Sequence, residues 1–258
     1  MSSAQVHPTT SIATPQVLSL AQTPAIPSYL QTVYWWAYID PRAVKLFERE
    51  WLVNLILFGN YSRLRDMALC KLSQHGQTHL IAGKTLQIAC VYGNLTAQLI
   101  QRMTSSASLK VVDVVPVQLE NLARKITPDP RVALETCDST ALPYGDAQFD
   151  QALLFFLLHE QPEASRRQTL REAIRVLKPG GRLVITDYHR PHPWHPLRPL
   201  MKWVFRHLEP FAMDLWHKPL TDYLPRHATV SHITHSTCFG GLYQILEITR
   251  AEQSQDST

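Results

Sequence analysis

The stretch KTLQIACVYGN, residues 84–94, decides the fold. Its first part is a short apolar strand over residues 85–90, and its end is a turn that contains Gly93. Helical spacing of apolar side chains follows at Thr96, Leu99, Ile100 and Met103. Because glycine permits close approach and a helix N-terminus offers free N–H groups, this strand, turn and helix predict one wall of a ligand site.

The same alternation continues along the chain. Further strands are expected over residues 109–113, 132–136, 149–155 and 182–187. Helical stripes separate them, and Lys178-Pro179-Gly180-Gly181 ends the last helix. Residues 227–234 and 242–249 form an expected final antiparallel pair. Strands that alternate with helices predict a Rossmann-like α/β fold with a mostly parallel, seven-stranded sheet and right-handed crossovers.

The domain organisation follows from composition. Residues 1–30 contain no Lys, Arg, Asp or Glu, so they lack a signal or transit peptide's charges and are expected to be a disordered tail. Asp40-Pro41 is a good helix start, and helices over residues 41–58 and 62–74 predict an N-terminal helical cap or lid within residues 31–80. Residues 81–250 form the expected ligand-binding catalytic domain, and a second disordered tail covers 251–258.

Composition also excludes some functions. The net charge of +4 is mild and the arginines are scattered, which argues against a nucleic-acid partner. A mild basic excess favours approach to anionic phospholipid. The four cysteines have no metal-ligand spacing and indicate a reducing compartment, and no apolar run approaches membrane-spanning length. A cytoplasmic protein, at the inner face of the cytoplasmic membrane, is therefore expected.

Three segments are predicted to meet at the carboxyl edge of the sheet, where ligands bind in such folds. The first is the turn around Gly93. The second is Asp113, which ends a strand twenty positions later and can accept both hydroxyls of a ribose. The third is Cys137-Asp138-Ser139, in which Asp138 can accept a bond from an adenine amino group.

Together with Leu142-Pro143-Tyr144, Phe149-Asp150 and Leu177-Lys178-Pro179-Gly180-Gly181, these segments resemble the class I S-adenosylmethionine-dependent methyltransferases over residues 84–190. The absence of GxGxxG argues against a nicotinamide dehydrogenase. The resemblance implies that S-adenosylmethionine binds to the following residues: Ala89, Val91, Gly93, Asn94, Asp113, Val114, Asp138, Ser139 and Phe155.

The first motif departs from that family's pattern. Gln87 stands where an acid is expected, Val91 replaces a glycine, and the bulky Tyr92 precedes Gly93. An α-amine has a pKa near 8, so only roughly a tenth is free at pH 7, and a nearby carboxylate would reduce that fraction at least about tenfold. The neutral Gln87, with Tyr92 orienting the amine, leads to the hypothesis that the nitrogen of the bound sulfonium compound reacts. Drift within a degenerate loop is the alternative.

The sequence further resembles the RquA family of rhodoquinone biosynthesis proteins. The matching segments are YWWAY (34–38), PRAV (41–44), FGNY (58–61), VYGN (91–94), FFLLHE (155–160) and FGGLYQ (239–244). This resemblance implies conversion of ubiquinone to rhodoquinone: an amino group replaces a ring methoxy group, S-adenosylmethionine donates the nitrogen, and Mn²⁺ assists.

A methoxyquinone is a vinylogous ester, so an amine can add to the ring and expel methoxide, and a divalent cation would stabilise the negative charge that develops. Candidate metal ligands are His159, Glu160, Asp187 and His189, which follow the fourth and fifth strands. Residues 194–216 mix aromatic and basic side chains. They predict either a helix that covers the sheet or an interfacial element that admits an isoprenoid tail at the membrane.

Two alternatives stay open. A conventional methyltransferase that acts on a quinone or a polycyclic phenol would fit the core motifs alone. A non-catalytic subunit with this fold, within a lipid-biosynthesis assembly, is the other.

Overall fold

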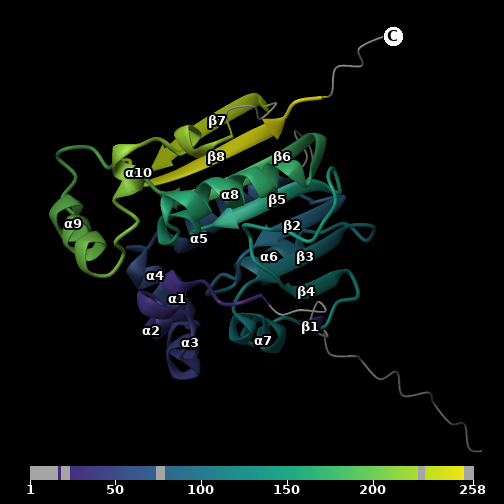
Figure 1. Cartoon of the computed structure of the whole chain (residues 1–258), viewed down its shortest axis with the longest axis horizontal. Coiled ribbons are helices and arrows are strands. Elements are labelled where there is room, and N and C mark those ends of the chain that lie inside the picture. The colour runs from purple at the N-terminus through teal and green to yellow at the C-terminus, as the bar shows by residue number, and fades with distance from the viewer. Residues whose placement is uncertain (1–16, 19–23, 74–78, 226–229, 253–258) are drawn as a thin grey trace, which may run out of the picture.

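The structure is a computed structural model that describes residues 17–18, 24–73, 79–225 and 230–252 (Figure 1). The tails expected over 1–30 and 251–258 fall mostly outside these residues. Within the first of them, strand β1 (Val17–Leu18) pairs with the sheet, and helix α1 (Ser28–Thr32) begins before the expected boundary.

One mixed sheet forms the centre of the molecule, in the order β1-β4-β3-β2-β5-β6-β8-β7. All neighbouring strands from β1 to β6 are parallel, and β8 is antiparallel to both β6 and β7. The strands after β1 are β2 (Lys84–Ile88), β3 (Ser108–Asp113), β4 (Val132–Thr136), β5 (Phe149–Phe155), β6 (Leu177–Tyr188), β7 (Val230–Cys238) and β8 (Tyr243–Arg250). These seven strands confirm the predicted Rossmann-like fold, to which β1 adds a two-residue edge.

Alternating side chains of the strands pack on opposite faces of the sheet. On β5, Leu153 and Phe155 belong to the same hydrophobic cluster as helices α5 (Tyr61–Leu72), α6 (Leu95–Gln101) and α7 (Pro116–Lys125). Ala152 and Leu154 belong to a second cluster with helix α8 (Glu163–Arg175) and the short helix η2 (Leu220–Tyr223). Because strand side chains have a period of two, a strand buried on both faces is apolar at successive positions, as residues 152–155 of β5 are.

Helices at the N-terminus cover the carboxyl edge of the sheet (Figure 1). The helix expected over 41–58 is divided into α3 (Pro41–Phe47) and α4 (Glu50–Ile56), which follow α2 (Trp35–Tyr38). The break lies at Glu48, whose carboxylate turns towards the loop around Gly93. Asp40 caps α3 by accepting from Arg42 N at 2.8 Å, as the Asp-Pro pair predicts.

The second half of the chain differs from the prediction at its element ends. Strand β6 begins at Leu177 rather than residue 182, since Lys178–Gly181 continues the strand with Gly180 at φ +74°. The predicted strand 227–234 includes residues outside the described part, and β7 reaches Cys238. Within residues 194–216, α9 (Arg198–His207) and α10 (Asp214–His217) are two separate helices.

Candidate functional site

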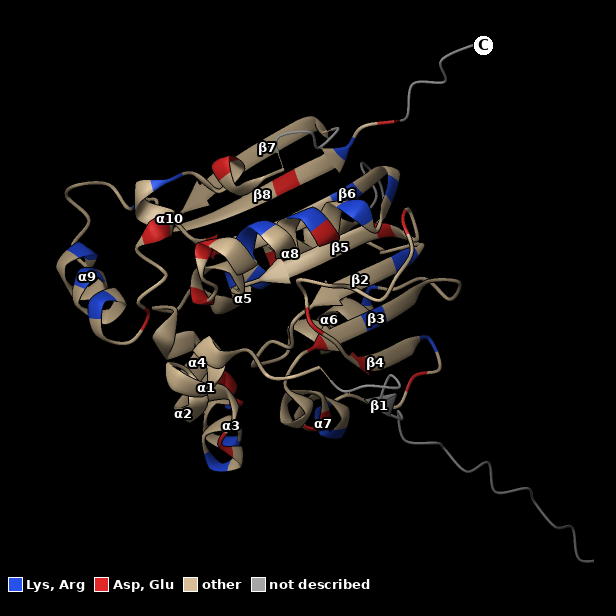
Figure 2. Ribbon diagram, in the orientation of Figure 1, with Lys and Arg blue, Asp and Glu red and all other residues tan. Residues whose placement is uncertain are grey.

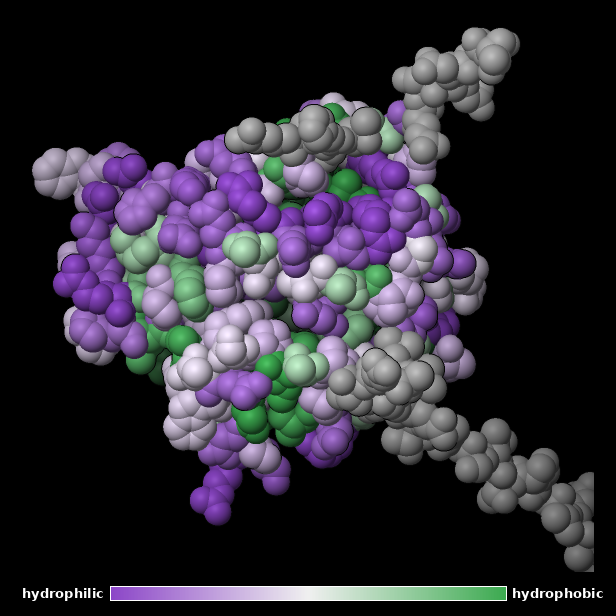
Figure 3. Space-filling model, viewed as in Figure 1, coloured by the Kyte–Doolittle hydropathy of each residue, from purple (hydrophilic) through white to green (hydrophobic). Residues whose placement is uncertain are grey.

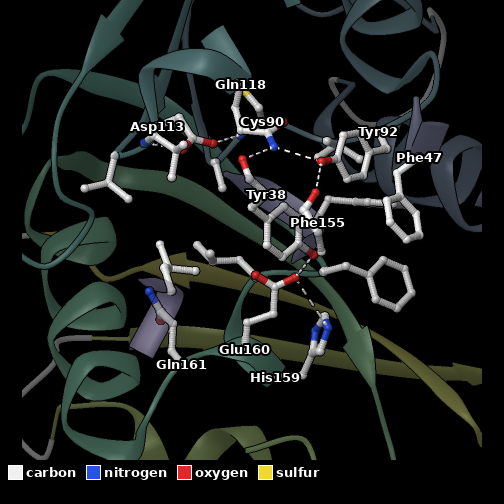
Figure 4. A pocket seen from close by; sticks show the side chains of 18 of the residues that line it. Tyr38, Phe47, Cys90, Tyr92, Asp113, Gln118, Phe155, His159, Glu160 and Gln161 are labelled. Carbon is white, nitrogen blue, oxygen red and sulfur yellow. Dashed lines mark hydrogen bonds and ion pairs between the residues drawn. The ribbon is translucent and has the colours of Figure 1, made fainter. Parts of the chain in front are cut away.

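A cavity of about 450 Å³ lies between the carboxyl ends of the strands and the N-terminal helices. Figure 4 shows its lining from close by. The predicted residues that line it are Ala89, Val91, Tyr92, Asp113, Val114, Asp138, Ser139, Phe155, His159 and Glu160. Gln87, Gly93, Asn94, Asp187 and His189 are not in its lining.

Asp113 is fixed at the end of β3 by backbone donors. Cys90 N donates to its Oδ2 at 2.7 Å, and Val115 N donates to its Oδ1 at 2.8 Å. Burial raises the pKa of Asp113 to about 6, although these N–H groups oppose the shift. The carboxylate therefore joins the turns after β2 and β3 and still faces the cavity, where it can accept from ligand hydroxyls.

The turn after β4 supplies a second polar wall. Thr140 N donates to Asp138 Oδ1 at 2.8 Å, which fixes the turn. The hydroxyl of Ser139 accepts from Gln161 Nε2 at 3.1 Å and bonds to the hydroxyl of Thr169. The aromatic ring of Phe155, at the end of β5, also lines the cavity (Figure 4).

The N–H groups of the loop after β2, which were expected to be free for a ligand, are bonded to side chains of the protein. Gly93 N donates to Glu48 Oε1 at 3.1 Å, and Leu95 N donates to the hydroxyl of Tyr61 at 2.9 Å. The N–H groups that were expected to be free at this helix start are therefore bound by the protein's own side chains. Lys125 neutralises Glu48 at 2.6 Å and also donates to the carbonyl oxygens of Val91 and Gly93.

A methyl group at Gly93 should destabilise the protein. Gly93 has φ +83°, and an added Cβ would lie 2.6–2.7 Å from the Oη and Cζ atoms of Tyr61. We expect Gly93→Ala to lower the free energy of unfolding by about 2–4 kcal/mol, measured by urea denaturation. Gly59→Ala is the matched control, because Gly59 has φ +77° and its added Cβ meets nothing within 4 Å. An equal loss in both variants would contradict the contact with Tyr61.

Gln87 is completely buried beneath the loop. Its Nε2 donates to Ala89 O at 3.0 Å, and its Oε1 accepts from the hydroxyl of Thr96 at 3.0 Å. Ala89 itself has φ +74°, a left-handed conformation that glycine adopts more easily. Gln87 therefore acts on the cavity only through the loop, as a positioning residue.

The ring of Tyr92 lines the cavity and stacks on Tyr38 with centroids 5.8 Å apart. Its hydroxyl donates to Ala37 O at 2.6 Å and accepts from Gln118 Nε2 at 2.8 Å (Figure 4). Burial raises the pKa of Tyr92, so the phenol stays protonated. The phenol expected to orient an amine is thus mainly engaged in joining the motif loop to α2.

A cluster of acidic groups surrounds His159 on the opposite wall. His159 Nδ1 pairs with Asp187 Oδ1 at 2.9 Å. Its Nε2 lies 3.7 Å from Glu160 Oε1 and 3.9 Å from Glu209 Oε2. Tyr38 donates from its hydroxyl to Glu160. Figure 4 shows Tyr38, Glu160 and His159 directed towards one another.

The charges of this cluster are coupled by burial. Burial alone would lower the pKa of His159, but Asp187, Glu209 and Glu160 outweigh it and raise the pKa to about 9. Burial raises the pKa of Glu160 to about 8, against the opposing effect of His159. The surrounding carboxylates therefore favour the protonated imidazole, and burial favours a proton on Glu160. Such a group can both donate and accept protons inside the cavity.

The four predicted metal ligands are not assembled into one site. Asp187 accepts from the backbone N–H groups of Leu158, His159 and Tyr188 as well as from the imidazole, so its oxygens are taken. His189 Nδ1 bonds to Gly241 O at 2.8 Å, outside the cavity. In the part of the chain that the structure describes, no three His, Cys, Asp or Glu side chains are placed to hold a metal ion.

Two side chains of this site, those of Glu209 and Tyr38, were not predicted from the sequence. Glu209 lines the cavity, and its Oε2 is buried without a hydrogen-bond partner among the described residues. It is the only acid between Asp187 and Asp214, and an acid isolated in an aromatic and basic segment was a usable signal. Tyr38 belongs to the YWWAY segment, and the resemblance that this segment carries assigns the tyrosine no role.

Comparison with known proteins agrees with this geometry. Residues 85–181 match the model of a family described as a methyltransferase domain. The chain is 25% identical to a demethylmenaquinone methyltransferase of Lactiplantibacillus plantarum, over 74% of this chain and 78% of that protein. It is 34% identical to a 2-phytyl-1,4-naphtoquinone methyltransferase of Nostoc punctiforme, over 41% of this chain and 46% of that protein.

The fold recurs in solved structures. A 1,6-didemethyltoxoflavin-N1-methyltransferase of Burkholderia thailandensis, crystallised with 1,6-didemethyltoxoflavin and S-adenosylhomocysteine, superposes with a TM-score of 0.52. It is 19% identical and covers 90% of this chain and 94% of that one. The chain thus has the Rossmann-like methyltransferase fold, and the two relatives described above are named as methyltransferases.

Proposed function

We propose that this protein, whose residues 85–181 match a methyltransferase domain, is an S-adenosylmethionine-dependent transferase that acts on an isoprenoid quinone. One observation carries the proposal. A single cavity joins the acids after β3 and β4 to an aromatic chamber with the buried cluster around His159. The names of two relatives, a demethylmenaquinone and a phytylnaphthoquinone methyltransferase, support a quinone as substrate.

Each part of the cavity has a defined task in this proposal. Asp113 accepts from the ribose hydroxyls of S-adenosylmethionine, and Asp138 accepts from its adenine amino group. The stacked rings of Tyr38, Phe47 and Tyr92 form a flat apolar wall suited to a quinone ring. The protonated group around His159 stabilises negative charge that develops on the quinone oxygens.

The finer proposal is that an amino group replaces a ring methoxy group. The α-amine of the sulfonium substrate forms a C–N bond to the ring, the C–OCH₃ bond breaks, and methanol leaves with the amine's proton. The quinone ring then accepts the electron pair of the cofactor's Cα–H bond, and its two oxygens take up the Cα–H and N–H protons, which gives a hydroquinone joined to a C=N bond. Water hydrolyses this C=N bond. An aminohydroquinone, methanol and an α-keto acid are the balanced products, so no external oxidant is needed.

Two features of the structure favour a reactive amine. Gln87 brings no charge to the loop, and its amide group donates to Ala89 O and accepts from Thr96. The carboxylate that does reach the loop, Glu48, is neutralised by Lys125 and is not part of the cavity lining. The amine therefore meets no carboxylate at the loop that would hold it protonated.

Methylation of the quinone ring is the second candidate, and the named activities of the relatives favour it. Here the protonated group around His159 would stabilise the phenolate oxygen of the hydroquinone substrate. The transferred group would be the methyl group of the sulfonium. Manganese, which the RquA resemblance implies, has no step in either scheme, because His189 lies apart from the other three expected ligands and backbone N–H groups engage Asp187.

Incubations of the purified chain with ¹⁵N-labelled S-adenosylmethionine and either ubiquinone or a demethylated quinone separate the candidates by mass. Amino exchange gives a lighter quinone that carries ¹⁵N, together with methanol. Methylation of a demethylated quinone gives a heavier product without ¹⁵N. Parallel reactions with Mn²⁺ and with a chelator test whether the metal is required. If no quinone of either kind changes mass, the proposed function is wrong and the non-catalytic alternative remains.

Restoring the missing acid tests the amino-exchange proposal. In Gln87→Asp, the new carboxylate would favour the protonated amine, so we expect amino exchange to fall at least about tenfold. Gln87→Asn is the matched neutral control, since it shortens the side chain equally. Binding of S-adenosylhomocysteine, measured by calorimetry, should stay within about threefold in both variants. Equal turnover of the Asp and Asn variants would count against a reactive amine.

A further inference from the structure

The exposed apolar side chains of this protein gather at one end of the molecule. Among the described residues, every exposed large hydrophobic side chain except Leu80 and Ile233 belongs to α2–α4 or to residues 194–208. Trp194 is 87% exposed, Trp203 55% and Leu55 63%. Hydrophobic surface is visible between α9 and α4 in Figure 3. We call the exposed apolar residues of α4 and of residues 194–208 the docking face.

The charged residues on the α9 side of the docking face are all basic. Residues 191–208 contain Arg198, Lys202 and Arg206 and no acid. In Figure 2 the ribbon of α9 carries blue segments, for Lys and Arg, and no red ones. Lys202 and Arg206 are exposed, as are Leu200 and Trp203 beside them, whereas Met201 and Phe205 are buried against the core. The helix thus presents aromatic and basic side chains to solvent together.

The cavity opens on this face. Ile56 at the end of α4 and Leu208 after α9 are 44% and 40% exposed, and both also line the cavity. Val53 and Val204 continue its apolar lining inwards from the same two elements. The mouth of the cavity therefore lies between α4 and α9, within the apolar surface.

We propose that the docking face binds the surface of an anionic lipid bilayer and holds the cavity mouth against it. Exposed tryptophans and basic residues suit the headgroup region, where indole rings are stable and cations meet lipid phosphates. A second copy of this chain fits less well, because a symmetric pair would oppose the three cations of α9 to one another. None of the described helices is long and apolar enough to cross a membrane. The purpose of this docking rests on the proposed function: it would let an isoprenoid quinone enter the cavity from the bilayer.

Co-sedimentation of the full chain with vesicles tests the proposal. The protein should sediment with vesicles that contain phosphatidylglycerol, and less with pure phosphatidylcholine or at high salt. The double variant Trp194→Ala, Trp203→Ala should bind anionic vesicles at least about tenfold more weakly. The double variant Lys202→Gln, Arg206→Gln should lose about tenfold on anionic vesicles alone. The control Leu80→Ala, Ile233→Ala, on distant exposed positions, should bind as the wild type does.

Three outcomes would overturn the docking proposal. They are a wild type that stays in the supernatant, a tryptophan variant that binds undiminished, and a wild-type dimer that the tryptophan variant converts to a monomer. Turnover of a quinone without an isoprenoid tail is measured separately, and the docking variants should retain it fully. Vesicle binding without turnover would refute only the proposed function, and turnover without vesicle binding would refute only the docking.

Discussion

The variant Asp113→Ala is expected to bind S-adenosylhomocysteine about a hundredfold more weakly than the wild type. Hydrogen bonds to a charged group are worth about 1.5–3 kcal/mol each, and two ribose hydroxyls would lose their acceptor. Calorimetric titration measures the change. Since Asp113 also holds Cys90 N and Val115 N, a loss of loop structure has to be separated from a loss of contact.

An analogue without the ribose hydroxyls makes that separation. A 2′,3′-dideoxy nucleoside ligand should bind the wild type and Asp113→Ala with similar affinity if the carboxylate acts through the hydroxyls. Equal weakening of both ligands would show that the residue only supports the loop. The wild type adds a pH test: its affinity for S-adenosylhomocysteine should fall as pH drops through about 6, as Asp113 takes up a proton.

The same raised pKa has a consequence for stability without ligand. Because burial makes the ionised form of Asp113 unfavourable in the folded protein, its ionisation lowers folding stability as pH rises through about 6. The effect is absent below the ordinary pKa of an aspartate. A bound ribose should offset part of this cost by donating to the carboxylate.

Replacing His159 should abolish most of the turnover and leave nucleotide binding intact. General acid–base groups typically contribute 10²–10⁴-fold, so we expect kcat of His159→Gln to fall about a hundredfold or more. His192→Gln is the control, because His192 is exposed and lies outside the cavity lining. Unchanged affinity for S-adenosylhomocysteine would show that the part of the cavity around Asp113 and Asp138 is intact. A kcat within about threefold of the wild type would exclude His159 from the chemistry.

The core of the fold could be read from the sequence because each element has a strong local pattern. Strands β4 and β5 lie where the apolar runs predicted them. The helix ends were harder, since tertiary contacts decide them. Glu48 breaks the helix expected over 41–58 by reaching Gly93, and no local pattern contains that contact.

The candidate site could be predicted only in the half that strand ends position. Asp113 and Asp138 follow strands, so topology alone brings them to the cavity. Glu209 comes from a segment without a motif, and Tyr38 from the YWWAY segment, whose resemblance assigns it no role. Their approach to His159 and Glu160 depends on how the helices fold over the sheet edge. His189 shows the converse: it follows β6 closely, yet its ring turns to Gly241.

The contacts of Glu48 and Tyr92 bear on how far the chain can be shortened. A fragment that starts at β2 would leave Lys125 without the carboxylate that it now meets at 2.6 Å, beneath a loop whose N–H groups would also lose their acceptors. Tyr92 would lose the carbonyl of Ala37, and its ring would be laid open to water. Residues 85–181 expressed alone would therefore have an incomplete cavity. The helices before β2 belong to the minimal fragment that should be purified.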